Sequence, residues 1–206
     1  SEERPTLIYI GDPMCSWCYG IAPELDALKD ELKEEVNYEI IMGGLRPYNT
    51  QTMVELKEFL THHWEEVHKR SSQEFNYEIL DKPMLTYDTE PPSRAVAIVR
   101  AMNPSLAFEF FHACQTMFYK ENKNMHRVDT YKEHVKALGL DFETFSTLFE
   151  SEEWAKKIKE DFQRSAKIGV RSFPTVLLKH NGQVNIIAQG YRTKAQMQKT
   201  IQTILQ

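Results

Sequence analysis

Two cysteines near the start of the chain constrain its fold more than any other feature. Cys15 and Cys18 lie three positions apart, directly after the apolar run Leu7–Ile10 and at the beginning of a helical pattern. Two thiols at this spacing can close a small disulfide ring, and the unpaired N–H groups of a helix start favour an anionic sulfur on the first thiol. The same spacing also provides half of the ligand set of many zinc and iron-sulfur sites. The rest of the sequence has to distinguish between these uses.

Length and composition indicate one globular unit. The chain has 206 residues, of which 41% are apolar and 27% charged, and no low-complexity tract interrupts it. This length allows one domain with a sizeable core, or one domain with a substantial insertion. The net charge is −5, with basic residues interspersed among acidic ones. Because nucleic acids and anionic membranes attract basic patches, neither is expected as a partner.

The sequence predicts a soluble protein of the cytoplasm. No apolar stretch approaches the roughly 20 residues that span a bilayer, and the first residues do not form a signal peptide. Only three cysteines are present, and Cys114 is left over beside the pair, so a disulfide-stapled scaffold is not expected. The chain begins with serine rather than methionine, which leaves a removed leader as an open alternative.

The first 44 residues predict a β-α-β unit. A mostly apolar run at 6–10 ends at Gly11 and predicts a buried strand. From Cys15 onward, apolar residues recur at helical spacing up to position 32, with Pro23 expected to bend the helix. A second strand is expected at 36–42, before Gly43-Gly44. Units of this kind usually contain parallel strands with a right-handed crossover.

The remainder predicts a helical segment followed by a β-β-α unit. Apolar residues recur at helical spacing around positions 53–67, 95–102, 106–117, 128–138, 142–149 and 154–166. Strands are expected at 175–178 and 184–188, because Asn181-Gly182 between them suits the tight turn of a hairpin. A C-terminal amphipathic helix around 197–204 can then cover one face of the sheet.

This order, with C-x-x-C at the end of the first strand, resembles the thioredoxin fold. Pro23 lies eight residues after Cys15, as in many thioredoxins, and Phe173-Pro174 immediately precedes the third strand. The large helical insert further resembles the DsbA-like group, and residues 12–18 and 43–47 are most similar to its FrnE-related branch. The resemblance implies an α/β thioredoxin fold with an all-helical insertion between its halves. The expected parts are 1–48, 49–168 and 169–206, forming one compact unit.

The same resemblance implies a thiol-disulfide oxidoreductase of the protein-disulfide reductase or isomerase type. Cys15 is then the nucleophile and Cys18 the resolving thiol, with no cofactor beyond this pair. Substrate proteins or small thiols and disulfides are the expected partners, and glutathione or another thiol is the expected electron partner. The central pair Ser16-Trp17 differs from the Gly-Pro usual in thioredoxins and from the Pro-His of DsbA. Redox potential, direction of electron flow and oligomeric state therefore stay open.

Five further residues are candidates for substrate binding or support. The resemblance implies a cis Pro174 facing the dithiol, and its missing N–H leaves the neighbouring backbone free to meet an extended substrate. Phe173 is expected either to line the substrate groove or simply to pack. Ser16 and Trp17 are expected to be exposed, with Trp17 as a substrate platform or a lid over the second cysteine. Asp12 can relay a proton during resolution, or serve only as a turn residue.

Two other functions remain as alternatives. The first is a glutathione-using enzyme of the related kappa transferase and hydroxychromene-carboxylate isomerase group, although those enzymes typically place serine at the position of Cys15. The second is a metal-binding module that uses the cysteine pair as a copper or zinc carrier, which a proline opposite the dithiol disfavours. No metal ligands are assigned, because His62, His63 and His68 lack the spacing of a helical zinc site. Cys114 lies on an apolar helix face and is expected to be an inert, buried thiol.

Overall fold

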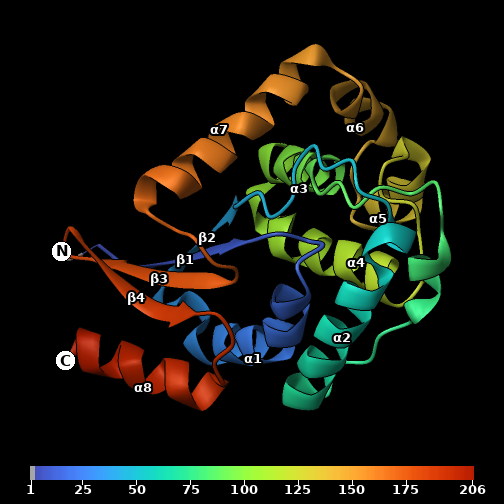
Figure 1. Ribbon diagram of the computed structural model, residues 1–206. Helices are drawn as coiled ribbons and strands as arrows, with labels where there is room; N and C mark the ends of the chain where they lie inside the picture. Colours follow the sequence, from blue (N-terminus) through green and yellow to red (C-terminus); the bar gives the residue numbers. More distant parts are fainter. Residues whose placement is uncertain (1–2) are drawn as a thin grey trace.

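The computed structural model describes residues 3–206, and its centre is a four-stranded sheet with helices on both faces and at one end (Figure 1). The strand order is β2-β1-β3-β4, with β1 parallel to β2 and antiparallel to β3, and β3 antiparallel to β4. The strands are β1 (Thr6–Gly11), β2 (Asn37–Met42), β3 (Thr175–His180) and β4 (Gln183–Gln189).

Strand β1 is buried on both faces and divides the core into two parts. Leu7 and Tyr9 belong to the large cluster that includes residues of α1 (Ser16–Leu32), whereas Ile8 and Ile10 belong to a smaller cluster with Leu177. This division follows from the alternation of side chains along a strand. Helix α1 connects the two parallel strands, and its apolar stripe, which the sequence predicts, is buried. The odd positions of β1 therefore face the helix that begins with the cysteines.

The C-terminal half forms as the sequence predicts. Asn181 and Gly182 both adopt positive φ, at 51° and 75°, which is the conformation that a tight hairpin between β3 and β4 requires. Helix α8 (Lys194–Leu205) begins at a capping box formed by Thr193 and Gln196. It contacts β4 and α1 and lies on the same side of the sheet as α1 (Figure 1).

Six α-helices lie between the two halves. Helix α7 covers the face of the sheet opposite α1 and contacts β2 and α3, while the others gather at one end of the sheet, where α2 and α4 contact α1 (Figure 1). The helices are α2 (Met53–Ser71), α3 (Glu90–Met102), α4 (Ala107–Tyr119), α5 (Lys132–Ala137), α6 (Phe142–Phe149) and α7 (Glu152–Ile168). The expected part boundaries at 48/49 and 168/169 stay a prediction.

The predicted helix over 128–138 is wrong in its first turn. Residues Val128–Tyr131 form a 3₁₀ turn, and α5 begins only at Lys132. Two side chains hold this turn by bonding back to the preceding loop: the Thr130 hydroxyl donates to the Asn124 carbonyl, and the Tyr131 hydroxyl donates to that of Met125. These contacts stabilise the 3₁₀ turn in place of the α-helix that the spacing of apolar residues predicts.

An ion pair fixes the helical insertion to the sheet. The Arg100 guanidinium of α3 donates to both carboxylate oxygens of Asp161 in α7, at 2.7 and 2.8 Å, and to the Ile40 carbonyl of β2 at 3.0 Å. Asp161 also accepts the backbone N–H of Met42. A bidentate pair of this kind sets geometry as well as contributing energy. Within residues 3–206, no helix has the length and apolar character needed to cross a membrane.

Candidate active site

Cys15 sits at the N-cap of α1, where its backbone is still extended. Its Sγ accepts the backbone N–H of Cys18 at 3.4 Å, so the sulfur takes the place of a capping oxygen. Its thiol in turn donates to the Phe173 carbonyl at 3.7 Å, across the chain. Both cysteines are free thiols. The first sulfur therefore lies between an N–H donor of the helix start and the backbone that precedes Pro174.

The two thiols differ in their surroundings. Cys18 lies one turn further along α1 and is fully buried, and burial together with the neighbouring Cys15 sulfur raises the pKa of its thiol. Cys15 is 5% exposed and is the more accessible of the two. This asymmetry suits an attacking thiol and a resolving thiol, because the thiolate is the reactive form and a buried thiolate is costly.

The motif is more enclosed than the sequence suggested. Ser16, expected to be exposed, is only 4% exposed, and Trp17 is half-buried. Segments distant in sequence close over the turn: the Tyr87 hydroxyl donates to the Met14 carbonyl, and Phe173 lies against Cys15. The prediction of an exposed motif interior is therefore wrong for Ser16.

The loop before β3 brings Phe173 and Pro174 to the dithiol. The Phe173–Pro174 peptide bond is cis, Pro174 is buried, and its carbonyl accepts the Gly190 N–H at 2.7 Å. The half-buried Phe173 ring lies directly over Gly43, after the end of β2. A Cβ at Gly43 would come within 2.0 Å of the Phe173 ring, so only glycine fits beneath this ring in its observed position. The ring therefore packs against the end of β2, next to the cysteines.

Trp17 belongs to an aromatic and cationic surface, which we call the border, formed by Trp17, Arg46, Phe59, His63, Arg70 and Tyr191. The indole ring lies 6.2 Å from the His63 ring and 6.1 Å from the Tyr191 ring, measured between centroids. Phe59 stacks on His63 and is 55% exposed. Arg46 and Arg70 lie over the rings of Phe59 and Tyr191. Through these rings the two guanidinium groups belong to the same surface as Trp17, which lies between the two cysteines in the sequence.

Asp12 is buried beneath the same turn. Its carboxylate accepts the N–H groups of Met14 at 2.8 Å and Leu45 at 2.9 Å, and so ties the end of β1 to the loop after β2. Burial raises the pKa of Asp12 to about 6, although both of these hydrogen bonds act in the opposite direction. Asp12 therefore builds the turn and also titrates close to neutral pH.

Three residues of the site are not identified by the sequence pattern: Tyr87, Gly43 and Tyr9, whose buried side chain interacts with Cys18. Tyr87 lies 72 positions after Cys15 in an irregular segment, and nothing in its neighbourhood marks it. The sequence pattern indicates Tyr9 only as part of an apolar strand, although it is the one residue of the run Leu7–Ile10 that carries a hydroxyl. An inward-facing hydroxyl on a strand that leads to two cysteines was the available signal.

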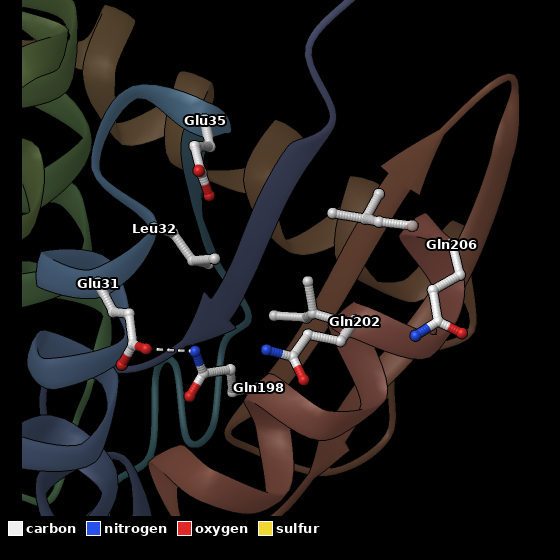
Figure 2. A pocket seen from close by; sticks show the side chains of 8 residues that line it. Glu31, Leu32, Glu35, Gln198, Gln202 and Gln206 are labelled. Carbon is white, nitrogen blue, oxygen red and sulfur yellow. Dashed lines mark hydrogen bonds between the residues drawn. The ribbon is translucent and has the colours of Figure 1, made fainter.

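Within residues 3–206, no group of three or more His, Cys, Asp or Glu side chains is placed to hold a metal ion. Two features of the structure, a surface pocket and Cys114, lie apart from the site. A pocket between α1 and α8 is lined by residues such as Glu31, Glu35 and Gln198 (Figure 2). It lies at the end of α1 remote from the cysteines. Cys114 is buried in α4, and burial raises the pKa of its thiol.

Fold and site together define a thioredoxin-like protein of the DsbA-like class, with a C-x-x-C pair at a helix start and a helical insertion. The chain belongs to the thioredoxin family, whose model matches residues 8–194. The predicted resemblance to DsbA-like thiol-disulfide oxidoreductases and the predicted thioredoxin fold are confirmed. Membership of the FrnE-related branch stays a prediction.

Solved structures share this fold over nearly the whole chain. A proposed protein disulfide isomerase from Nitrosomonas europaea is 32% identical, with 98% of each chain covered and a TM-score of 0.89. DsbM from Pseudomonas aeruginosa, described as a cytosolic disulfide reductase, is 24% identical, with 97% of this chain and 98% of that chain covered and a TM-score of 0.80. DsbM has also been solved with GSH, in a form with a TM-score of 0.72 and 22% identity over the same shares of the two chains.

A curated relative is the ClpXP adapter protein SpxH of Shouchella clausii (strain KSM-K16). It is 24% identical over 175 residues, which cover 84% of this chain. The match covers only 57% of SpxH, so the chain spans little more than half the length of this relative.

Proposed function

We propose that the chain is a thiol-disulfide oxidoreductase of the protein-disulfide reductase or isomerase type. The observation that carries the proposal is the position of Cys15, whose sulfur caps α1, accepts the Cys18 N–H and lies against the backbone before Pro174. A helix N-terminus favours an anionic sulfur, and a second thiol one turn away can displace whatever binds to the first.

The proposed reaction has two exchange steps. The Cys15 thiolate attacks one sulfur of a substrate disulfide; a Cys15–substrate S–S bond forms, and the other substrate sulfur leaves with the electron pair of the broken bond. Cys18 then gives up its proton and attacks the Cys15 sulfur. The Cys15–Cys18 disulfide forms, the second substrate sulfur leaves and is protonated, and the substrate has gained two electrons and two protons. The reverse sequence oxidises a dithiol.

A small thiol such as glutathione is the proposed electron partner. The border, which includes Trp17 of the C-x-x-C motif, carries Arg46 and Arg70, and these guanidinium groups can attract the carboxylates of such a molecule. The likeness to DsbM, which has been solved with GSH and is described as cytosolic, supports both this partner and a cytoplasmic location.

The test is turnover with insulin and with glutathione disulfide as substrates. We expect Cys15→Ser to reduce the rate at least about a thousandfold, because no other accessible thiol can replace the nucleophile. Cys18→Ser should accumulate a mixed disulfide at Cys15, visible by mass spectrometry. Cys114→Ala is the matched control and should keep the rate within about twofold.

Selective alkylation provides a second measurement of the same assignment. In the reduced protein, iodoacetamide should modify Cys15 well before Cys18, because Cys18 is fully buried and its thiol pKa is raised. Equal rates for the two thiols would contradict the assignment of nucleophile and resolver. A glutathione-dependent transferase or isomerase activity that survives Cys15→Ser would instead favour the alternative group, whose members typically place serine at this position.

A further inference from the structure

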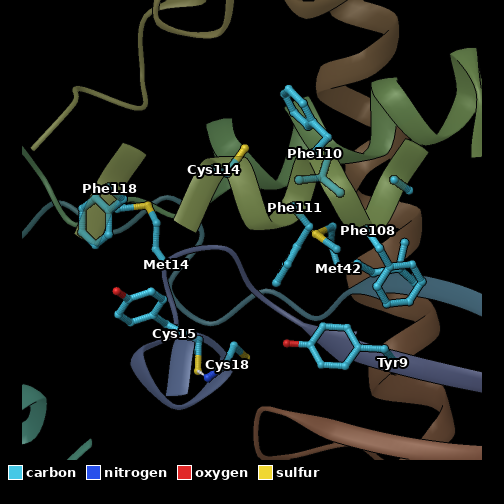
Figure 3. Close-up of a cluster of buried hydrophobic side chains, with 14 of the residues drawn as sticks. Tyr9, Met14, Cys15, Cys18, Met42, Phe108, Phe110, Phe111, Cys114 and Phe118 are labelled. Carbon is cyan, nitrogen blue, oxygen red and sulfur yellow. Dashed lines mark hydrogen bonds between the residues drawn. The ribbon is translucent and has the colours of Figure 1, made fainter. Parts of the chain in front are cut away.

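The hydroxyl of Tyr9 points toward the resolving thiol, Cys18 (Figure 3). Tyr9 lies in β1 with its ring fully buried between the strand and α4, 6.0 Å from the Phe108 ring and 5.5 Å from the Phe111 ring. These contacts fix the ring, and its hydroxyl points toward Cys18 at the start of α1 (Figure 3). A tyrosine hydroxyl in such a position needs a hydrogen-bond partner, because an unpaired buried hydroxyl is costly.

Gly11 makes room for this arrangement. A Cβ at Gly11 would lie 2.7 Å from both the Tyr9 hydroxyl oxygen and Cε1, closer than such atoms approach one another. Gly11 has no positive φ, so its backbone conformation does not require glycine. The missing side chain instead provides the space through which the Tyr9 hydroxyl reaches the first turn of α1.

Cys18 needs a donor when it reacts. Burial raises the pKa of its thiol, and the neighbouring Cys15 sulfur raises it further. The hydrogen bond from the Tyr9 side chain acts in the opposite direction and lowers the pKa of Cys18. Burial holds the pKa of Tyr9 well above its ordinary value, so this hydroxyl keeps its proton and donates at every working pH.

We propose that Tyr9 is a catalytic residue for resolution: its hydroxyl donates a hydrogen bond to the Cys18 sulfur as that sulfur becomes anionic and attacks Cys15. This inference rests on the proposed exchange function. In the step, the Cys18 S–H bond and the Cys15–substrate S–S bond break, the Cys15–Cys18 bond forms, and the substrate sulfur leaves with an electron pair and takes up a proton. Tyr9 is neither oxidised nor deprotonated.

The test separates attack from resolution with dithiobis(nitrobenzoate) in rapid mixing. The first coloured thiolate is released when Cys15 attacks, at a rate proportional to reagent concentration; the second is released by Cys18, at a rate independent of it. In Tyr9→Phe, we expect the first rate to stay within about twofold. The second should fall at least about tenfold at pH 7, equivalent to ~1.4 kcal/mol.

A pH profile distinguishes this role from a structural one. The groups that face Cys18 are Tyr9 from β1, Asp12 from the following loop, Cys15 from the helix cap and Tyr119 from α4. The pKa of Asp12 is about 6, so the part of the resolution profile above about pH 8 reports mainly on Cys18. We expect Tyr9→Phe to move the profile to higher pH. An unchanged second phase with an unchanged profile would overturn the proposal.

Two variants complete the design. Tyr131→Phe is the matched control, because it removes another fully buried tyrosine hydroxyl, remote from the dithiol, and should change neither phase. If Tyr9→Phe does not fold, Gly11→Ala decides, because its methyl group displaces the hydroxyl and should likewise slow only the second phase. An unchanged second phase there would also overturn the proposal.

A direct titration keeps this inference separate from the exchange function. In Cys15→Ser/Cys114→Ala, where Cys18 is the single thiol, the pH dependence of its reaction with iodoacetamide reports ionisation of that thiol. Adding Tyr9→Phe should raise the Cys18 pKa even if the wild-type protein reduces no disulfide substrate. A rise with no exchange activity would refute the proposed function alone, whereas exchange with no rise would refute the role of Tyr9 alone.

Discussion

Asp12 accepts two backbone hydrogen bonds at a place where burial makes its charge costly. Its pKa is raised from 3.8 to about 6, with burial as the largest cause, so the folded state binds this proton more tightly than the unfolded state. Stability linked to Asp12 is therefore greatest below pH 4. It decreases as pH rises through the interval between the two pKa values, and it is constant above that interval.

This linkage predicts a pH-dependent difference between the wild type and Asp12→Asn. A rise of about two pKa units corresponds to a loss of roughly 3 kcal/mol of unfolding free energy for the wild type between pH 4 and pH 7, relative to the neutral amide. Urea denaturation of both proteins at several pH values measures the difference, because other titrating groups are shared. If the unfolding free energies of the two proteins changed in parallel with pH, the pKa of Asp12 would not be raised in the folded state.

At the scale of elements, the end of β2 and the loop before β3 meet at Gly43 and Phe173. Because a Cβ at Gly43 would lie 2.0 Å from the Phe173 ring, the ring or the backbone must move if any side chain is added. We expect Gly43→Ala to destabilise the protein by about 1 to 3 kcal/mol, the usual cost of overpacking. The free energy of unfolding in urea provides the measurement.

The double variant tests whether this contact is the cause. Phe173→Ala removes the ring, so adding Gly43→Ala to it should cost little, and the two changes should be non-additive by at least about 1 kcal/mol. Gly139→Ala serves as a comparison, since no atom lies within 4 Å of a Cβ there and any cost comes from its positive φ. Additive effects of the two changes would place the clash elsewhere.

The same elements show what the sequence can predict. The apolar pattern of residues 142–149 matches α6, and Asn181-Gly182 identifies the hairpin, because both depend on local conformation. The 3₁₀ segment Tyr77–Asp81 has no such signal. Its Ile79 N–H is bound by the Asn122 side chain, 43 residues away, and contacts of this kind cannot be read from spacing.

In the candidate site, too, some residues can be recognised from the sequence and others cannot. Cys15 and Cys18 are recognisable from their spacing and their place after a strand, and Phe173-Pro174 from its place before one. Gly11 and Gly43 are not recognisable, because each is required only by the ring that lies over it. Local pattern thus locates reacting groups, whereas the residues that make room for them become apparent only when distant segments are brought together.

At the scale of the whole molecule, the reactivity of the Cys114 thiol reports whether the helical insertion unfolds together with the thioredoxin-like halves. It lies in α4, which contacts both α1 and α3, and its side chain is completely buried. Burial also raises the pKa of its thiol, so two barriers oppose reaction in the folded state. Modification of Cys114 therefore requires an opening of the structure that exposes α4.

If the insertion and the halves unfold together, Cys114 should become reactive only through global unfolding. In Cys15→Ser/Cys18→Ser, where Cys114 is the single thiol, we expect labelling without denaturant at least about a thousandfold slower than in the unfolded chain, since domain stabilities are typically about 5 to 15 kcal/mol. Its dependence on urea should match that of unfolding followed by circular dichroism. The reference is the same protein with Met84→Cys, because Met84 is 90% exposed and a thiol there needs no opening. Fast labelling of Cys114 with little dependence on urea would mean that α4 opens separately, and the chain would then not unfold as one cooperative unit.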